Sequence, residues 1–544
     1  MASRSIAISD LAFTWPDGTT QFTGIDAVFG PGHTGVVGLN GSGKSTLLRL
    51  IAGDLVPDRG SITVDGRIGY LRQSIALDAE RHADEILGID GIRKALHRIE
   101  SGTGAADDFD VVAGRWDVEE RAVALIGSLG LGHIVSEPAQ LDRPVSTLSG
   151  GEAVLLGFVA ELLQDPDVLL LDEPTNNLDR FARQRLYEAV DAFAGTVLTV
   201  SHDRDLLDRA DDIAELRAGS MRLFGGNFTT YQRIVEREQE TARAAIRDAR
   251  SDVRKQKREL VEARIKLDRR LRTAKKAEEE KRVPKIISGL RKMAAEESAG
   301  KLRNNHIEKA ADAAAHLVQA ETQLRDDREI RVDLPATQLF PGQDVIELTD
   351  LRLACGPVVS LAITGPERIG LIGRNGIGKT TLLRAIVDAG PHVPWRWLPQ
   401  RLDIFDGDRS IADNVASVAP QALPEQIRAQ LARFLFRGSD ADKPAAALSG
   451  GEQLRAALAM LLLAQPAPQL LLLDEPTNNL DLPSLAHLTQ ALSNYRGALI
   501  VASHDIAFLR QIGITRWVEL TENGLVPADD MASGRPEASG HPLH

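Results

Sequence analysis

Two glycine-rich stretches have residue types and spacing that could bind phosphate. The stretch "GLNGSGKS" begins at Gly38 and "GRNGIGKT" begins at Gly373, and both fit the pattern GxxxxGK[ST]. Each follows an apolar run typical of a buried strand and precedes an apolar run typical of a helix. Glycines let a backbone curl so that its N–H groups face phosphate oxygens at a helix N-terminus. The sequence therefore predicts two loops that hold nucleotide phosphates.

The end of each predicted loop carries a positive charge and a hydroxyl group. Lys44 and Lys379 would face the β- and γ-phosphates, and the hydroxyls of Ser45 and Thr380 would hold Mg²⁺. We expect the residues that bind ATP in these loops to be Gly38, Asn40, Gly41, Ser42, Gly43, Lys44, Ser45 and Thr46 in the first, and Gly373, Asn375, Gly376, Gly378, Lys379, Thr380 and Thr381 in the second.

Two acidic pairs open the motif "DEPTNNLD", and each follows an apolar run. Asp172 and Asp474 would end buried strands, where a carboxylate can hold Mg²⁺ through water. Glu173 and Glu475 follow directly and could polarise the attacking water, although positioning and charge stabilisation would supply most of the catalysis. The alternative is that an acidic pair after a strand only caps a helix.

The chain repeats its motifs in the same order in both halves, which is a sign of internal duplication. A histidine in "SHD", His202 or His504, lies 29 residues after each glutamate and could sense the γ-phosphate. A glutamine, Gln73 or Gln400, lies between the phosphate loop and the motif "LSGGE". From that glutamine to the serine of "LSGGE" the spacing is 76 residues in the first half and 49 in the second. The first half therefore carries an insertion, roughly residues 76–137, with helix-like runs and an acidic character around "ADDFD".

Composition limits the class of protein. A chain of 544 residues is long enough for two or three domains, and 43% hydrophobic residues can fill globular cores. Cys355 is the single cysteine, which excludes an internal disulfide and fits a reducing cytosol. The most apolar stretch, Ala456–Asp474, is interrupted by two prolines and two glutamines, which favours a buried helix and strand over a membrane span. We predict a cytoplasmic α/β protein with two P-loop domains in tandem.

The segment Tyr231–Ala310 differs from the rest of the chain. It holds 24 basic and 14 acidic residues, a net charge of +10, whereas the whole chain has a net charge of −13. Apolar residues recur every seven positions from Ile246 to Leu267, which predicts a hairpin of two long antiparallel helices. A solvated spacer is the alternative, but a spacer does not require this charge, this length, or a tip, residues 281–292, that is both basic and apolar. The basic residues of the tip are Lys281, Arg282, Lys285, Arg291 and Lys292.

The signature "LSGGE" and the ordered motif set resemble two fused ATP-binding cassettes. In that family each ATP lies between the phosphate loop of one cassette and the signature of the other, so ATP joins the halves and hydrolysis releases them. The resemblance implies a first site built from Lys44, Ser45, Gln73, Asp172, Glu173 and His202 with Ser449, Gly450 and Gly451. It implies a second site built from Lys379, Thr380, Gln400, Asp474, Glu475 and His504 with Ser149, Gly150 and Gly151. The ligands of Mg²⁺ would be Ser45, Gln73 and Asp172 in the first site, and Thr380, Gln400 and Asp474 in the second.

The sequence departs from this family pattern in two places. An aromatic ring usually stacks on adenine, and Trp15 (or Phe13) is suited to that role, whereas the matching stretch of the second half offers Cys355. The second signature is followed by the basic residue Arg455, and the first is followed by the apolar "AVLLGFVA". Because both glutamates remain, we predict two working but unequal sites.

The tandem cassettes and the long charged linker are similar to the F subfamily of ATP-binding cassette proteins. This resemblance covers about Ile6–Leu525 and implies an ATPase that binds the ribosome near the tRNA exit site. The linker tip would then point toward the P-site tRNA and the peptidyl transferase centre. Some members adjust translation generally and others dislodge ribosome-targeting antibiotics. The short insertion and the apolar tip favour the ribosome-protection type.

Two rival functions remain open at this point. The energising subunit of a membrane importer would need a membrane partner and a short linker, and a DNA-repair or chromosome ATPase usually inserts its coiled coil inside a cassette. We expect a monomer whose cassettes pair within the chain, without a transmembrane subunit. The expected divisions are a first cassette at residues 1–225, a linker at 226–343, a second cassette at 344–525 and a disordered tail at 526–544.

Overall fold

The computed structural model describes residues 5–73, 81–144, 148–176, 178–279, 305, 307–321, 335–402, 404–478 and 480–528. The chain divides into two compact units. One unit comprises Met1–Phe228 together with Arg328–His544, and the other comprises Thr229–Asp327. Within the first unit, we call the elements β1 to β9 the first cassette and the elements η3 to β17 the second cassette.

Each cassette contains a six-stranded sheet with the same order of strands. The order is β5-β6-β7-β3-β8-β9 in the first cassette and β13-β14-β15-β12-β16-β17 in the second. All neighbours pair in parallel except the last two strands of each sheet, which are antiparallel. The strands of the first sheet are β3 (Gly32–Gly38), β5 (Ile68–Leu71), β6 (Val168–Asp172), β7 (Thr196–Val200), β8 (Asp212–Arg217) and β9 (Ser220–Gly225). Those of the second are β12 (Arg368–Ile372), β13 (Trp395–Leu398), β14 (Leu470–Asp474), β15 (Ala498–Ala502), β16 (Arg516–Thr521) and β17 (Gly524–Pro527).

The central strands of both sheets are buried along their whole length. Every residue of β6, β7, β14 and β15 is buried, which explains why these strands read as continuous apolar runs rather than as alternating patterns. A smaller antiparallel sheet accompanies each central sheet. Its strands are β1 (Ile6–Thr14), β2 (Thr20–Phe29) and β4 (Arg59–Val64) in the first cassette, and β10 (Asp344–Arg352) and β11 (Val358–Thr364) in the second.

Helices complete both cassettes. Those of the first are α1 (Lys44–Ile51), α2 (Ala83–Ile86), α3 (Asp90–Glu100), α4 (Ala106–Val112), α5 (Val118–Ser128), α6 (Gly150–Leu163), α7 (Arg180–Asp191) and α8 (Arg204–Leu207), with the 3₁₀ turn η1 (Pro138–Asp142). Those of the second are α11 (Lys379–Ala389), α12 (Ile411–Val418), α13 (Pro424–Arg433), α14 (Gly450–Leu462), α15 (Leu482–Ser493) and α16 (Ile506–Gln511), with the 3₁₀ turns η3 (Pro335–Thr337), η4 (Gly438–Asp442) and η5 (Ala445–Ala447).

The extra residues of the first cassette form part of its helical region. Isolated bridges join His82 to Pro144 in the first cassette and Ser410 to Pro444 in the second, and they mark equivalent points in both helical regions. Sixty-two residues separate the bridged positions in the first cassette and 34 in the second. The surplus accommodates the contacting helices α3 and α4, and α4 contains the acidic run "ADDFD".

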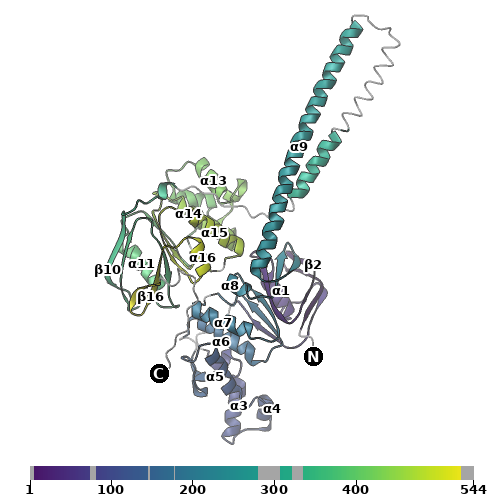
Figure 1. The fold of residues 1–544 in the computed structure, drawn as a ribbon. Coiled ribbons are helices and arrows are strands. Elements are labelled where there is room, and N and C mark those ends of the chain that lie inside the picture. The colour runs from purple at the N-terminus through teal and green to yellow at the C-terminus, as the bar shows by residue number, and fades with distance from the viewer. Residues whose placement is uncertain are drawn as a thin grey trace. The chain divides into compact units, whose positions relative to one another are not determined.

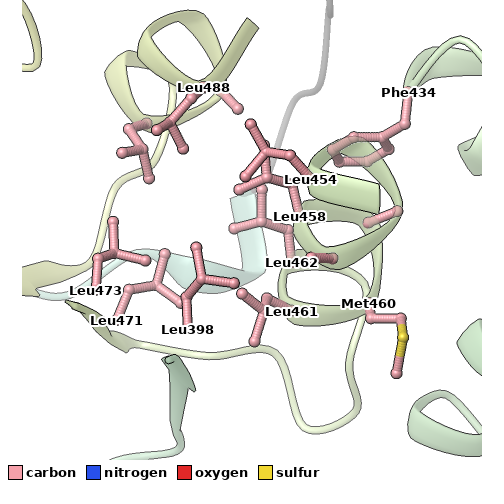
Figure 2. Close-up of a cluster of buried hydrophobic side chains, with 14 of the residues drawn as sticks. Leu398, Phe434, Leu454, Leu458, Met460, Leu461, Leu462, Leu471, Leu473 and Leu488 are labelled. Carbon is pink, nitrogen blue, oxygen red and sulfur yellow. The ribbon is translucent and has the colours of Figure 1, made fainter. Parts of the chain in front are cut away.

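Helix α14 packs against the second central sheet through a leucine-rich face. Figure 2 shows Leu454, Leu458 and Leu461 of α14 directed toward side chains from other elements, including Leu473 on β14 and Leu488 on α15. These side chains belong to one buried cluster, and each fully buried leucine contributes about 1.5–3 kcal/mol to stability. The packing fixes the signature, which opens α14, against the strand that ends in Asp474.

The second unit is dominated by α9 (Phe228–Glu279), a helix of 52 residues that Figure 1 draws without interruption. At 1.5 Å per residue it is about 78 Å long. Residues 307–321 are also helical, and Arg250 Nη2 donates to Glu321 Oε1 at 2.9 Å, which joins the two arms. Ile246 on α9 and Ala313 on the returning helix are buried, in agreement with an apolar seam. The predicted tip, residues 281–292, lies outside the described residues.

Among the described parts of the chain, no helix is long and apolar enough to cross a membrane. The stretch Ala456–Asp474 instead divides between α14 and β14, as its prolines and glutamines predict.

Candidate nucleotide sites

The first phosphate loop lies in a cavity of about 400 Å³ together with residues from several distant segments. The cavity brings together most of the residues predicted for the first half: Trp15, Asn40, Gly41, Gly43, Lys44, Ser45, Thr46, Gln73, Glu173 and His202. Three further lining residues, Gln21, Asn176 and Val200, were not among the predicted site residues. Asn176 belongs to the motif "DEPTNNLD", which could have identified it, whereas nothing in the sequence distinguishes Gln21.

The backbone of the first loop depends on glycine at Gly43. This residue has φ 100° and immediately precedes α1, and a Cβ atom there would lie 2.8 Å from the ring of Phe22. Lys44 is buried and donates from Nζ to the carbonyl oxygens of Gly38, at 2.9 Å, and of Leu39, at 3.1 Å. Burial lowers the pKa of Lys44, and the charge of Glu173 opposes that shift. The loop thus holds a desolvated cation facing the cavity.

Each loop hydroxyl meets the carboxylate at the end of a central strand. Ser45 Oγ donates to Asp172 Oδ1 at 3.0 Å, and Thr380 Oγ1 donates to Asp474 Oδ2 at 2.7 Å. Burial raises the pKa of both aspartates, and the hydrogen bond from the hydroxyl opposes it. One hydroxyl and one carboxylate are the donors that Mg²⁺ uses when phosphates and water complete its coordination. No cluster of three or more His, Cys, Asp or Glu that could hold a metal by itself occurs among the residues described here, so these pairs fit Mg²⁺ only in the company of phosphate.

Both predicted catalytic glutamates have an unusual backbone. Glu173 has φ 50° and Glu475 has φ 45°, a left-handed conformation that costs a non-glycine residue about 1–3 kcal/mol. Their N–H groups donate to the carbonyl oxygens of Val200 and Ala502, each at 2.8 Å, on the neighbouring strand. Burial raises the pKa of Glu173 to about 8, and burial also raises the pKa of Glu475. The strain and the desolvation occur at the same position in both cassettes, as is common at functional sites.

The two predicted histidines contact these glutamates. His202 Nε2 and His504 Nε2 each lie 3.3 Å from Oε1 of the glutamate in their own cassette. Burial lowers the pKa of His202 to about 3 and of His504 to about 2, with the loop lysine as the next cause in both. Both rings are therefore neutral, and Nε2 can act as donor or acceptor according to its tautomer.

In the second site, the loop lysine contacts side chains as well as its own loop. Lys379 Nζ lies 2.6 Å from His504 Nε2 and 3.5 Å from Glu475 Oε1, and it also donates to Gly373 O at 2.9 Å. His504 Nε2 in turn lies 3.0 Å from Asn375 Oδ1. Gln400 is exposed two residues beyond β13.

Loop residues of each cassette bond to the motif "NNLD" of the other. Asn40 N donates to Asp481 Oδ2 at 3.0 Å, and Asn375 N is 3.5 Å from Asp179 Oδ2. A cavity of about 450 Å³ is lined by Ser149 and Gly151 from the first signature and by Asn375 from the second phosphate loop. The structure thus brings together part of the composite second site that the sequence predicted.

The signatures begin α6 and α14 in the same way. Ser149 and Ser449 are N-caps whose hydroxyls accept from the backbone N–H of Glu152, at 3.3 Å, and of Glu452, at 3.4 Å. Gly150 and Gly450 are the first helical residues. Gly451 is packed so closely that a Cβ atom there would lie 2.5 Å from Ser484 Oγ.

The sequence departs from the family pattern at the position expected to stack on adenine and after the signature, and the structure shows the side chains at both places. Trp15 lines the first cavity and packs edge-on against Phe13, with 5.1 Å between ring centroids. Cys355 is exposed, and its Sγ lies so close to the second loop that a Cβ atom on Gly378 would be 2.2 Å away. The guanidinium of Arg455 lies over the ring of Phe436, 5.6 Å from its centroid. Arg455 therefore packs inside its own cassette.

Comparisons with known proteins agree with this geometry. The family model described as "ABC transporter" matches residues 27–176 and 358–478. The chain is 31% identical to the energy-dependent translational throttle protein EttA of Escherichia coli (strain K12) over 541 residues, covering 92% of this chain and 89% of that protein. It is 30% identical to the "Probable ATP-binding protein YbiT" of Escherichia coli O157:H7 over 538 residues, covering 93% and 94%.

Solved structures show the same architecture. The structure of an RNase-L Inhibitor superposes with a TM-score of 0.56 at 17% sequence identity, covering 96% of this chain and 92% of that one. The predicted fold class, two P-loop cassettes joined by a long helical linker, is thereby confirmed. The matching family and relatives also confirm that the chain is an ATP-binding ATPase.

Proposed function

Because this chain belongs to the F subfamily of ATP-binding cassette proteins, we propose that it uses ATP to act on the translating ribosome. The observation that carries the proposal is the similarity to a translational throttle protein along 541 residues, which extends across both cassettes and the linker. A ribosomal partner would place the protein in the cytoplasm.

We assign the ATP chemistry to paired sites between the cassettes. The first site uses Lys44 with the second signature, and the second site uses Lys379 with the first signature. Glu173 and Glu475 would orient and polarise the attacking water, and His202 and His504 would hold the γ-phosphate. Ser45 with Asp172, and Thr380 with Asp474, would hold Mg²⁺, with Gln73 and Gln400 as the remaining protein ligands. When bound, Mg²⁺ would neutralise charge that develops on the phosphate oxygens.

The proposed cycle follows from the bonds between the cassettes. Each phosphate loop bonds to the opposite cassette through Asn40 or Asn375, so ATP held by a loop and the opposite signature would stabilise the paired state. Hydrolysis would remove the γ-phosphate from that contact and favour separation. The ATP-loaded state is therefore the one expected to bind the ribosome.

The linker is the element proposed to reach the ribosomal RNA and the P-site tRNA. Tyr231–Ala310 carries a net charge of +10 on a chain of −13, so the linker is attracted to polyphosphate while the rest of the protein is repelled. Helix α9 alone is 52 residues long. We propose that the five basic tip residues contact RNA near the peptidyl transferase centre.

Two outcomes of ribosome binding are compatible with these features. Protection of the ribosome from antibiotics is the first candidate, because the predicted tip is both basic and apolar. General control of translation is the second candidate, and the similarity to EttA favours it. Deletion of the gene separates them. Ribosome protection predicts a lower inhibitory concentration for drugs of the peptidyl transferase centre with normal growth otherwise, whereas general control predicts altered growth without drug.

The experiment that tests the proposal is co-sedimentation of the Glu173→Gln, Glu475→Gln variant with ribosomes in ATP. This variant should bind ATP without hydrolysing it and should pellet with ribosomes in ATP but not in ADP. Reversing the charge of the five tip residues to Glu should weaken the binding. A matched control reverses five exposed basic residues within α9, Arg247, Arg254, Lys255, Lys257 and Arg258. Absence of ribosome binding by the parent variant in ATP would overturn the proposal, and equal losses in the tip variant and the control would overturn the role of the tip.

A further inference from the structure

One face of helix α7 contacts the loop that follows His202 in the first cassette. Arg183, Tyr187 and Asp191 are four residues apart, so they lie on the same face of the helix. The hydroxyl of Tyr187 donates to Asp203 Oδ2 at 2.6 Å, and Arg183 Nη1 lies 3.6 Å from the same oxygen. Tyr187 is 6% exposed and the side chain of Asp203 is 7% exposed. The shorter of the two contacts is therefore a hydrogen bond between buried groups.

A further contact joins the same face of α7 to the chain beyond α8. Asp191 bonds to Arg209, and the guanidinium of Arg209 lies over the ring of Tyr187, 5.1 Å from its centroid. An arginine in this position is attracted to the face of the ring. Tyr187 thus contacts both ends of α8, through its hydroxyl at Asp203 before the helix and through its ring at Arg209 after it.

Both oxygens of the Asp203 carboxylate are in use. Oδ1 caps α8 by accepting from Asp205 N at 3.0 Å and from Leu206 N at 3.3 Å, while Oδ2 accepts from Tyr187. The backbone N–H of Asp203 donates to Ser201 Oγ at 3.1 Å. Because the two oxygens belong to one planar group, the bond that holds Oδ2 also directs Oδ1 toward α8. Tyr187 therefore fixes the backbone directly after His202.

The ring of His202 depends on this backbone for its position. Nε2 lies 3.3 Å from Glu173 Oε1, and Nδ1 is buried without a hydrogen-bond partner among the described residues. In many functional histidines a hydrogen bond at the second ring nitrogen sets the tautomer and the orientation. Here that role falls to the packing around the ring and to the loop, and Asp203 is the direct neighbour of His202 in the loop.

The second cassette has different residues at the equivalent positions. Counted from the N-cap of each helix, the positions of Arg183, Tyr187 and Asp191 are taken in α15 by Leu485, Thr489 and Ser493. The hydroxyl of Thr489 donates to Leu485 O at 2.8 Å, and that of Ser493 donates to Thr489 O at 2.7 Å. Both hydroxyls are thus bonded within their own helix. In the part of the chain that the structure describes, the tyrosine contact to a histidine loop therefore occurs in the first cassette only.

We propose that Tyr187 is a positioning residue for His202 and that it serves the first ATP site alone. Its hydroxyl holds Asp203, Asp203 holds the loop, and the loop holds the ring beside Glu173. Tyr187 is not among the residues that line the first cavity, so it acts through its neighbours. The inference deepens the proposed function, because it rests on the assignment of His202 to the γ-phosphate, and it does not depend on the ribosome.

Turnover at one site at a time tests the proposal in the full chain. Glu475→Gln leaves hydrolysis to the first site and Glu173→Gln leaves it to the second, with the double variant as the blank. Tyr187→Phe, which removes only the hydroxyl, should lower kcat about tenfold in the Glu475→Gln background and leave it unchanged in the Glu173→Gln background. An unchanged kcat at the first site, or an equal loss at both sites, would overturn the proposal.

Inhibition by ADP separates positioning of the histidine from general damage to the site. ADP lacks the phosphate assigned to His202, so Tyr187→Phe should change the inhibition constant of ADP at the first site less than about twofold. A loss of ADP binding as large as the loss of kcat would show that the cavity itself is damaged, and it would overturn the positioning role.

Two further variants test the route through Asp203. If Tyr187 acts through this carboxylate, Tyr187→Phe should add less than about twofold to the loss caused by Asp203→Ala, and losses that multiply would overturn this route. Tyr495→Phe is the matched control, because it removes another buried tyrosine hydroxyl, which donates to Pro468 O at 3.3 Å. Tyr495→Phe should leave kcat unchanged at both sites. A loss at the first site equal to that of Tyr187→Phe would overturn the specific role of Tyr187.

Hydrogen exchange tests the contact without turnover. In the variant with both catalytic glutamates replaced by Gln, Tyr187→Phe should speed exchange at the two α8 amides capped by Asp203 by about fivefold or more. Thr489→Val, the equivalent change in the second cassette, should leave the exchange of α16 unaltered. Unchanged exchange of α8 in Tyr187→Phe would overturn the proposal even if ribosome binding is intact. Absence of ribosome binding, with the effects of Tyr187→Phe as expected, would instead count only against the proposed function.

Discussion

In the first cassette, Lys44 turns its ammonium group onto the carbonyl oxygens of its own loop, whereas in the second cassette Lys379 contacts His504 and also approaches Glu475. The two lysines occupy equivalent positions in the same motif and on equivalent helices. Their different partners show that a repeated motif fixes the backbone of a site more firmly than its internal hydrogen bonds. The second site has a closed network of side chains that a nucleotide must rearrange, and the first site has a cavity lined by an aromatic ring.

The two cassettes also differ outside their phosphate loops. The first cassette adds α3 and α4, and it buries Arg93 among three carboxylates. It also has His33 eleven residues before its loop lysine, where the second cassette has Arg368. The two central sheets have the same strand order, so these differences leave the architecture unchanged.

The largest expected effect is the loss of hydrolysis when the glutamates are replaced. Glu173→Gln with Glu475→Gln should lower kcat by about 10²–10⁴-fold, the usual contribution of a group that activates water. At ATP concentrations well below KM the single variants should differ, with the greater loss for Glu173→Gln, because the aromatic wall gives the first site the lower KM. Steady-state ATPase assays at saturating ATP measure the loss in the double variant, and assays below KM compare the single variants. Equal losses in Glu173→Gln and Glu475→Gln would mean that the two sites do not differ in activity.

Removal of Arg93 should destabilise the helical region of the first cassette. Its Nη1 donates to Asp84 at 2.5 Å and to Asp142 at 2.6 Å, while Nε donates to Glu119 at 2.5 Å. The arginine is 3% exposed, so Arg93→Met would leave the carboxylates of Asp84 and Glu119 largely buried without a cation, at a cost of about 3–5 kcal/mol. Hydrogen exchange should report faster opening of α3 and α5 and unchanged α13.

A surface ion pair of the second cassette serves as the control for Arg93. Arg428 bonds to Asp442, and both side chains are about half exposed, so Arg428→Met should change stability little. If both variants opened their helices equally, burial would not be the origin of the difference between the two helical regions.

Acid should destabilise the first cassette through His33. Burial lowers the pKa of His33 to about 4, and Nε2 lies 3.0 Å from Thr199 Oγ1 on β7. The unfolded chain takes up a proton below about pH 6.5 and the folded chain only near pH 4, so stability is present above pH 6.5 and decreases between these values. The loss by pH 5 should be about 2 kcal/mol. Arg368, the equivalent residue, donates to the carbonyl oxygens of Leu492, Tyr495 and Ile512 and does not titrate in this range.

Denaturant unfolding at pH 7 and pH 5 measures this effect. His33→Gln should reduce the difference in unfolding free energy between the two pH values, whereas the same change at the exposed His316 should leave it unaltered. An unchanged pH difference in His33→Gln would assign the acid sensitivity to other groups.

The sequence predicts the parts of each site that lie within one short segment. Local chemistry dictates the backbone at the phosphate loops, at the strand-ending aspartates Asp172 and Asp474 and along the linker helix, so these features can be predicted from the sequence. Contacts between distant segments cannot be predicted in the same way. Arg455 packs on Phe436, nineteen residues away, and Asn40 N donates to Asp481 of the other half. Such partners depend on the order of strands and on the pairing of the cassettes, which spacing along the chain does not encode.

The smallest expected effect concerns the wall of the first cavity. Trp15 lines it, and an aromatic ring stacked on a base contributes about 1–3 kcal/mol. Trp15→Cys, which copies the residue of the second half, should therefore raise KM for ATP about tenfold in the Glu475→Gln background. Stacking does not distinguish bases, so KM for GTP should rise by a similar factor if GTP is a substrate.

Replacement of Cys355 tests whether its thiol contacts the base in the second site, as the ring of Trp15 is expected to do in the first. The thiol lies against Gly378 and is exposed, and it offers far less surface for stacking than an indole. Cys355→Ala should therefore change KM in the Glu173→Gln background less than twofold. A rise as large as that of Trp15→Cys would mean that the second site holds its base through the thiol. In that case the two sites would reach similar affinity by different contacts, and the inequality between the cassettes would have to come from the contacts of the two loop lysines instead.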